Sequence, residues 1–353
     1  MALTIIIGIL TLSVLVIAHE LGHYFTAKWT GVKVEEFGLG MPPRIWGIQR
    51  GETLYSINWI PFGGFCKMLG EEDPTYPRSL ASKSHATRVL ILSAGCIVNI
   101  LLPIILFSIS YMVPHNIMVE TIQIQQVAAN SPAQRAGMEA GDVLLAIDNN
   151  PVNNRGEVSY YLQMNLGKET PILLQKADQT EEVVTVTPRW NPPEGQGATG
   201  IQISGIDSHI EHVSLPFWEA IPKSVVHCWE ILVIMKNEIG GWFIRGQAPE
   251  GVAGPVGVVQ ITGEVAKAGL SPDLEIAALN SLSLGIFNLF PLPALDGGRL
   301  VFVGLEWVRR GKRISPKKEG MVHFIGFVML IMVLVVVTYQ DIARIISGES
   351  LIP

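Results

Sequence analysis

Four long apolar stretches constrain the fold of this chain more than any other feature of its sequence. They cover residues 1–27, 88–113, 276–308 and 321–341, and each reaches the roughly 20 helical residues that cross a hydrocarbon core. Only 16% of the residues are charged. A segment in lipid must satisfy its backbone hydrogen bonds internally, so we predict an α-helical polytopic membrane protein with four transmembrane helices.

Positive charge in one loop predicts the orientation of these helices. The basic link between the last two stretches, residues 309–320, carries six cations: Arg309, Arg310, Lys312, Arg313, Lys317 and Lys318. Such clusters remain on the cytoplasmic side of a membrane. By alternation, we expect residues 28–87 in the cytoplasm, and the N-terminus and the long loop that ends at residue 275 outside it.

The two long connections predict different structures. Residues 28–87 contain a strand-prone run at residues 53–60, and we expect a membrane-associated β-hairpin or loop region there. Residues 116–206 alternate strand-prone runs with turn residues. Within them, residues 131–149 indicate a capped helix, a glycine stop and a strand, which resembles part of a PDZ domain. We therefore expect an inserted extracytoplasmic PDZ-like α+β domain.

The region after this domain, residues 207–275, has a mixed character. Between residues 215 and 243, aromatic side chains alternate with charges, and no uncharged run there is long enough to span a bilayer. Aromatic anchors beside charges are typical of an amphipathic helix at the membrane surface, so we expect an interfacial helical region. A fifth crossing is the alternative, and it would upset the charge topology.

The sequence His19-Glu20-Leu21-Gly22-His23 lies inside the first apolar stretch. Positions i and i+4 share a helix face, so two imidazoles can approach one Zn²⁺ while Glu20 reaches the water beside it. In the alternative reading, both histidines have only structural partners. Ionisable side chains at membrane depth are costly unless they have partners or a function, and this cost favours the metal.

A catalytic zinc ion usually has three protein ligands, so a third must lie elsewhere. Glu35 and Glu36 follow the motif in a glycine-punctuated, strand-like region. Asp296 has a better context, because it is the sole acid between Glu275 and Glu306 in an apolar stretch. Prolines 291 and 293 would break the helix just before Asp296, and irregular backbone at membrane depth is tolerated where it lines a cavity. The alternative is a simple proline kink.

These motifs together resemble the site-2 protease family, and the layout with one outer PDZ-like domain looks like its bacterial RseP-like branch. The resemblance rests on HExxH in a first transmembrane helix and NxxPxPxLDGG at residues 288–298. It extends to residues 38–40, 63–65, 95–99 and 254–257. Members of this branch often carry two tandem PDZ domains, whereas residues 116–206 have room for one.

The resemblance implies a function and a set of residues. It implies an intramembrane zinc metalloprotease of the bacterial cytoplasmic (inner) membrane that binds one Zn²⁺ through His19, His23 and Asp296, with Glu20 as the catalytic glutamate. Asn99 would assist near the active site and Asn288 would handle the substrate backbone, although helix packing is the alternative for both. The substrates would be transmembrane proteins, such as anti-sigma factors or signal-peptide remnants, already cut once by another protease.

Composition excludes other classes of partner. The net charge of −6 supplies no basic field for nucleic acid. Cys66, Cys96 and Cys228 lack the paired spacing of a zinc ribbon or a disulfide framework, so we expect free thiols. A membrane adaptor would not need Asp296 in an apolar helix, and a metal transporter would need acids in the other helices. The enzyme hypothesis therefore leads.

Overall fold

A computed structural model describes residues 2–246 and 253–347 of the chain. The chain divides into two compact units. The first comprises residues 1–111 and 251–353, and the second comprises residues 112–250. Met1, residues 247–252 of the expected interfacial region and residues 348–353 lie outside the described residues.

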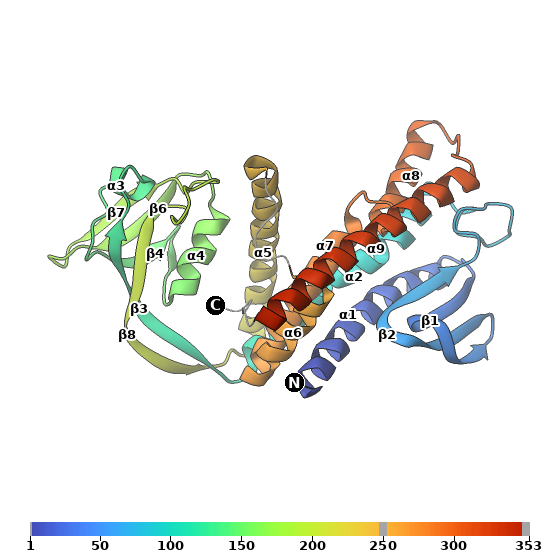
Figure 1. Cartoon of the computed structure of the whole chain (residues 1–353), viewed down its shortest axis with the longest axis horizontal. Coiled ribbons are helices and arrows are strands. Elements are labelled where there is room, and N and C mark those ends of the chain that lie inside the picture. Colours follow the sequence, from blue (N-terminus) through green and yellow to red (C-terminus); the bar gives the residue numbers. More distant parts are fainter. Residues whose placement is uncertain (1, 247–252, 348–353) are drawn as a thin grey trace. The chain divides into compact units, whose positions relative to one another are not determined.

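The first unit is built mainly of helices (Figure 1). They are α1 (Ala2–Trp29), α2 (His85–Met112), α6 (Pro255–Val265), η1 (Ala266–Ala268), α7 (Leu270–Leu289), α8 (Asp296–Val308) and α9 (Pro316–Ser347). Among the described residues, three helices are long and apolar enough to cross a membrane: α1 from Ile5, α2 and α9. These correspond to the first, second and fourth predicted spans.

The third predicted span, residues 276–308, is not one continuous helix. It consists of α7, which begins six residues earlier than expected, and α8, with residues 290–295 between them. Pro291 and Pro293 have no backbone N–H to donate, so they cannot continue an α-helix through this segment. Ala294 adopts a left-handed conformation with φ of 77°. The helix break expected from the two prolines therefore lies directly before Asp296.

The strands β1 (Val34–Arg50) and β2 (Thr53–Met68) form an antiparallel sheet. Both strands bend, so residues 36–39 pair on one side with residues 54–57 and on the other with residues 64–67. Residues 44–50 pair with residues 53–58 on the side opposite residues 36–39. The run at 53–60 is thus a strand, as expected, but it lies in the interior of the sheet. Within the described residues, 64–68 have a partner on one side only and form an edge strand.

The sheet packs against helices of its own unit through a buried apolar cluster. Its members come from α1, the sheet, α2, α8 and the loops beside the sheet: Ala27, Val32, Val34, Phe37, Cys66, Met68, Leu80, Ile91, Leu92 and Val303. Gly22 of α1 lies so close to α2 that a Cβ there would be 2.7 Å from the carbonyl oxygen of Ala94. Burial of these side chains fixes the edge strand beside the helices that carry the two histidines and Asp296.

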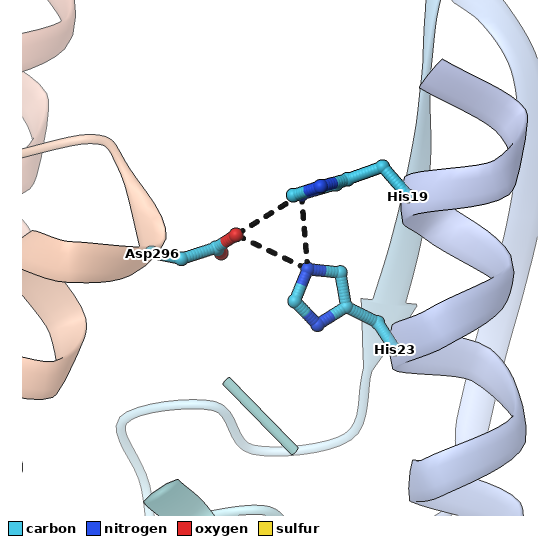
Figure 2. A group of neighbouring side chains, drawn as sticks. All are labelled: His19, His23 and Asp296. Atoms are coloured by element: carbon cyan, nitrogen blue, oxygen red, sulfur yellow. Dashed lines mark hydrogen bonds and ion pairs between the residues drawn. The ribbon is translucent and has the colours of Figure 1, made fainter. Parts of the chain in front are cut away.

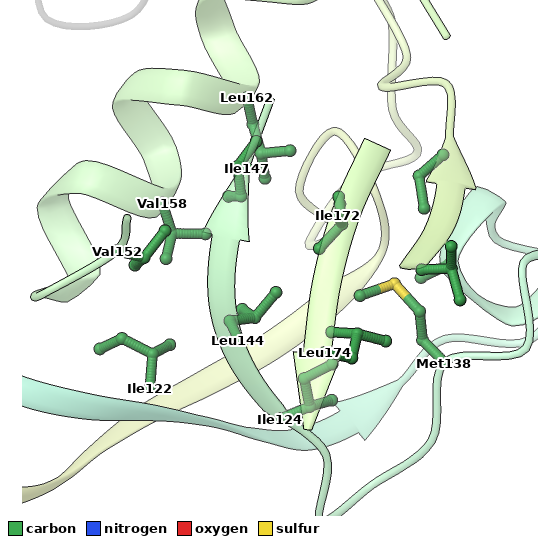
Figure 3. Packing of buried hydrophobic residues seen from close by; sticks show 13 residues of the cluster. Ile122, Ile124, Met138, Leu144, Ile147, Val152, Val158, Leu162, Ile172 and Leu174 are labelled. Atoms are coloured by element: carbon green, nitrogen blue, oxygen red, sulfur yellow. The ribbon is translucent and has the colours of Figure 1, made fainter. Parts of the chain in front are cut away.

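The second unit contains a six-stranded sheet. Its strands are β3 (His115–Val127), β4 (Val143–Ile147), β5 (Asn150–Pro151), β6 (Thr170–Gln175), β7 (Glu181–Val186) and β8 (Ile201–Val213). The order is β7-β6-β4-β3-β8, with β5 on β4. Helices α3 (Pro132–Arg135) and α4 (Arg155–Met164) complete the domain, whose core includes Ile122, Leu144, Ile172 and Leu162 (Figure 3).

Residues 131–149 have the predicted local structure. Ser131 caps α3 by accepting a hydrogen bond from the Gln134 N–H, Gly137 follows with φ of 81°, and β4 comes next. β8 pairs with β3 as far as Val213, beyond residue 206, where we expect the domain to end. An α+β domain is therefore present, and its likeness to PDZ domains remains a prediction.

The helix α5 (Phe217–Arg245) also belongs to the second unit. Its Asn237 donates hydrogen bonds to the carbonyl oxygens of Gln163 and Met164 at the end of α4. Tyr160 of α4 donates to Glu230 of α5 at 3.0 Å. Residues 217–245 are thus helical, and α5 is not among the candidate spans found in the described residues. A position of this helix at a membrane surface remains a prediction.

Candidate metal centre

The helix α1 carries His19 and His23 on one face. Their Nε2 atoms lie 3.2 Å apart, and both side chains are buried. One helical turn separates positions i and i+4, so the two rings converge because of the helix period itself. Glu20 lies one position round the helix and is half-buried.

Asp296 reaches the two histidines from the first residue of α8 (Figure 2). Its Oδ2 atom lies 3.0 Å from Nε2 of His19 and 3.1 Å from Nε2 of His23. The structure thus brings together the three side chains that the sequence predicted as metal ligands. Within the described residues, they are also the one group of such side chains close enough to hold a metal ion.

The spacing of these three atoms fits a zinc ion. A tetrahedral zinc site has bonds of about 2.0–2.1 Å to nitrogen and oxygen, which places neighbouring ligand atoms about 3.3 Å apart. The distances of 3.0, 3.1 and 3.2 Å between the ligand atoms are close to that value. Two imidazoles and one carboxylate also form a donor set typical of catalytic zinc, with one position left for water or substrate.

The outer nitrogens of both rings have partners. Nδ1 of His23 lies 2.8 Å from the carbonyl oxygen of Ile91. Nδ1 of His19 lies 3.3 Å from the Asn99 side-chain amide, which is fully buried. A carbonyl acceptor keeps the proton on Nδ1, so it leaves Nε2 free for a metal. Both rings are therefore held with Nε2 toward Asp296.

The loop before Asp296 is fixed by α9. The backbone N–H of Ala294 donates to Nδ1 of His323 at 3.1 Å. Gly326 allows Pro293 to pack closely, because a Cβ there would lie 2.2 Å from the Pro293 side chain. The irregular backbone between α7 and α8 therefore has specific partners, as polar backbone groups away from water require.

A cavity of about 550 Å³ opens beside the three residues. Its lining includes Glu20 and Asn288, as well as Phe65, Cys66, Lys67 and Met68 of the edge strand. Asn99 is not part of that lining, as far as the described residues extend. The structure thus places Asn288, the expected contact of the substrate backbone, at the cavity. The position of Asn99 beside His19 favours orientation of that ring over contact with a substrate.

The edge strand also contacts Glu20 directly. A Cβ at Gly64, the first residue of that strand, would lie 3.4 Å from Cγ of Glu20. Burial raises the pKa of the Cys66 thiol, and the nearby Glu20 and Glu71 carboxylates raise it further. The thiol is therefore neutral at physiological pH, which argues against a role as a nucleophile.

Sequence reasoning missed two charged residues that line the same cavity. Arg299 lies three positions after Asp296 on α8 and pairs with Glu71 at 2.6 Å. Arg299 is a charged residue within an apolar stretch, and this position could have indicated a functional role. The sequence contained no comparable signal for Glu71, because its role depends on where the end of β2 lies in space.

Comparisons with known proteins indicate the same metal, zinc. A model of the family described as "Peptidase family M50" matches residues 7–333. The chain is similar to a protein of Clostridium acetobutylicum named as a zinc metalloprotease, with 37% identity over 339 residues that cover 96% of this chain and 97% of that protein. It is also similar to the zinc metalloprotease RasP of Oceanobacillus iheyensis, with 28% identity over an alignment of 434 residues that covers 97% and 99% of the two chains.

Proposed function

This chain belongs to peptidase family M50, the site-2 protease family, and is a zinc metalloprotease; from that premise we propose that it hydrolyses peptide bonds within transmembrane segments of other membrane proteins. The observation that carries the proposal is the group His19, His23 and Asp296 beside a cavity that Glu20 lines. Six helices and strands supply residues to the cavity lining, and four of them are the helices α1, α2, α7 and α8.

We assign the residues of the reaction as follows. His19, His23 and Asp296 hold the zinc ion. A zinc ion in such a site polarises the substrate carbonyl and makes water nucleophilic near neutral pH. Glu20 accepts the proton of the attacking water and returns it to the leaving amine.

The edge strand offers a way to present an extended substrate. A peptide bond inside a helix is hidden by its own hydrogen bonds, so the substrate must unwind before its carbonyl can reach the metal. Residues 64–68 have one paired side within the described part of the chain, and four of them line the cavity. We propose that the unwound substrate adds to this edge as a further strand.

Proline substitutions test the strand pairing. Lys67→Pro removes a backbone donor from the edge strand, and we expect it to reduce cleavage. The matched control is Trp46→Pro on the outer strand, which pairs with residue 57 away from the cavity. Equal activity of both variants, with zinc retained, would contradict the pairing.

The membrane arrangement completes the proposal. The six cations of the link after α8 support a cytoplasmic position for it. Alternation then places the active site toward the cytoplasm of a bacterial inner membrane, and the N-terminus and the α+β domain outside it. That domain could capture a C-terminus exposed by an earlier cut, or could exclude bulky ectodomains. Suitable substrates include anti-sigma factors and signal-peptide remnants.

The central experiment joins a metal assay to a cleavage assay. Purified wild type, Glu20→Gln and Asp296→Ala are incubated with a model transmembrane substrate, and zinc is measured in each preparation. We expect wild type to cleave, Glu20→Gln to retain zinc without cleaving, and Asp296→Ala to lose both. Asp178→Asn, an exposed change in the turn after β6, is the control. Cleavage by Glu20→Gln at the wild-type rate would overturn the mechanism.

A further inference from the structure

Glu71 connects two elements of the catalytic cavity. It follows β2 by three residues, and its Oε1 atom accepts a hydrogen bond from the backbone N–H of Met68 at 3.0 Å. Its other oxygen, Oε2, lies 2.6 Å from Nη1 of Arg299. One carboxylate therefore contacts both the last residue of the edge strand and the helix α8.

Arg299 transmits this contact to the metal centre. It lies on the first turn of α8, three residues after Asp296, so its side chain and Asp296 are neighbours on that helix. Both Glu71 and Arg299 line the cavity. Their side chains are 22% and 35% exposed, whereas the comparable pair of Lys67 and Glu35 is 61% and 32% exposed.

We propose that the Glu71–Arg299 pair is a positioning unit that fixes the register of a bound substrate strand against the metal centre. This inference rests on the proposed function, because it assumes that the substrate pairs with residues 64–68. Glu71 fixes the C-terminal end of that strand, and Arg299 holds Glu71 at a set place relative to Asp296. Neither residue acts on the reacting atoms.

Register matters because strand addition by itself does not choose a peptide bond. A strand can slip along an edge by two residues and form the same pattern of backbone hydrogen bonds with the same face toward its neighbour. A fixed distance between edge and metal therefore selects the bond that is cut. Loss of the pair should lower the rate and broaden the choice of bond.

The test maps cleavage sites as well as rates. Glu71→Gln retains an acceptor for Met68 but loses the ion pair, and Arg299→Gln loses the same pair from the other side. We expect kcat to fall about 10- to 100-fold in each, since small misplacements of reacting groups have effects of that size. We expect KM to change less, zinc content to equal wild type, and mass spectrometry to detect added products cut two residues away.

Two comparisons separate positioning from general stability. The double variant Glu71→Gln/Arg299→Gln should be no slower than either single variant, because both remove one interaction. Arg299→Lys keeps the charge and should retain a single main cut. The control Arg78→Gln breaks the exposed pair with Glu52 away from the cavity, and we expect wild-type rate and cut site.

The outcomes distinguish this inference from the proposed function. If wild type cleaves and Glu20→Gln does not, the proposed function stands. A single unchanged cut site with a rate within about twofold of wild type in Glu71→Gln would then overturn the positioning role alone. A loss of rate in Glu71→Gln that accompanies loss of zinc, without new cut sites, would also overturn it.

Discussion

The buried amide of Asn99 on α2 lies 3.3 Å from Nδ1 of His19 on α1. Nδ2 is the amide atom nearest the ring, while Oδ1 is a buried atom without a partner in the described part of the chain. A neutral His19 that binds metal through Nε2 carries its proton on Nδ1 and needs an acceptor. Amide oxygen and nitrogen are hard to distinguish, and the opposite orientation would supply that acceptor.

Asn99 should therefore control zinc affinity. We predict that Asn99→Ala weakens zinc binding by about 10- to 100-fold, as the loss of an outer partner of a ligating histidine typically does. Zinc retention against increasing chelator concentration measures this effect. Thr262→Val, a buried change on α6 that removes a contact with Asn280, is the control. Equal chelator sensitivity of Asn99→Ala and wild type would contradict the assignment.

The close approach of α2 to the two histidines depends on Gly95. A Cβ there would lie 2.4 Å from Nε2 of His23 and 2.8 Å from Nε2 of His19. We predict that Gly95→Ala destabilises the protein by about 1–3 kcal/mol, as overpacking does, and abolishes zinc binding. Thermal unfolding and zinc content report the two effects.

Gly304 on α8 provides a matched control for Gly95. A Cβ at Gly304 would meet no atom within 4 Å in the described part of the structure. Because alanine is a better helix former than glycine, Gly304→Ala should keep zinc and activity and gain up to about 1 kcal/mol of stability. Similar losses in both variants would mean that the contact of Gly95 with the histidines has no special role.

Ala294 should limit stability through its backbone conformation. Its φ of 77° lies in the left-handed region, where a residue with a Cβ is disfavoured by about 1–2 kcal/mol. We predict that Ala294→Gly raises the thermal midpoint in detergent, followed by circular dichroism. Ala278→Gly, at a buried helical position of α7, should lower it. A fall in both variants would contradict the strain at Ala294.

The sequence predicts the centre of the site well and its surroundings poorly. His19 and His23 follow from the helix period, and Asp296 follows from the cost of a lone acid in an apolar stretch. The helix break before Asp296 follows from its two prolines. These features depend on local chemistry, so neighbouring residues suffice to predict them.

The sheet and the ion pair of the cavity depend on contacts distant in sequence. β1 and β2 bend at several register shifts, and these decide that residues 64–68, not 53–60, form the edge. The alternation of apolar and polar residues identifies a strand, but it does not tell which of the two backbone edges of that strand is paired. Glu71 and Arg299 meet because the sheet packs on α8 through Val303 and its neighbours. No local pattern predicts that meeting.

Acid should weaken the link between α1 and the sheet through Glu52. Hydrogen bonds from Arg78 and Lys28 lower the pKa of Glu52 from its ordinary 4.5 to about 2. The folded state binds the proton more weakly than the unfolded state, so the network stabilises the fold fully above about pH 4.5. That stability is lost as the pH falls from about 4.5 to about 2.

Comparison of wild type with Glu52→Gln across pH isolates this contribution. The gap between their thermal midpoints should be constant at neutral pH and close as the pH falls toward 2. Because the three side chains are 28–51% exposed, screening limits the gap to about 1 kcal/mol or less, and 1 M salt should reduce it. Glu194→Gln, an exposed change after β7, should show no such gap. A gap that widened in acid would exclude Glu52 as the group whose protonation destabilises the fold.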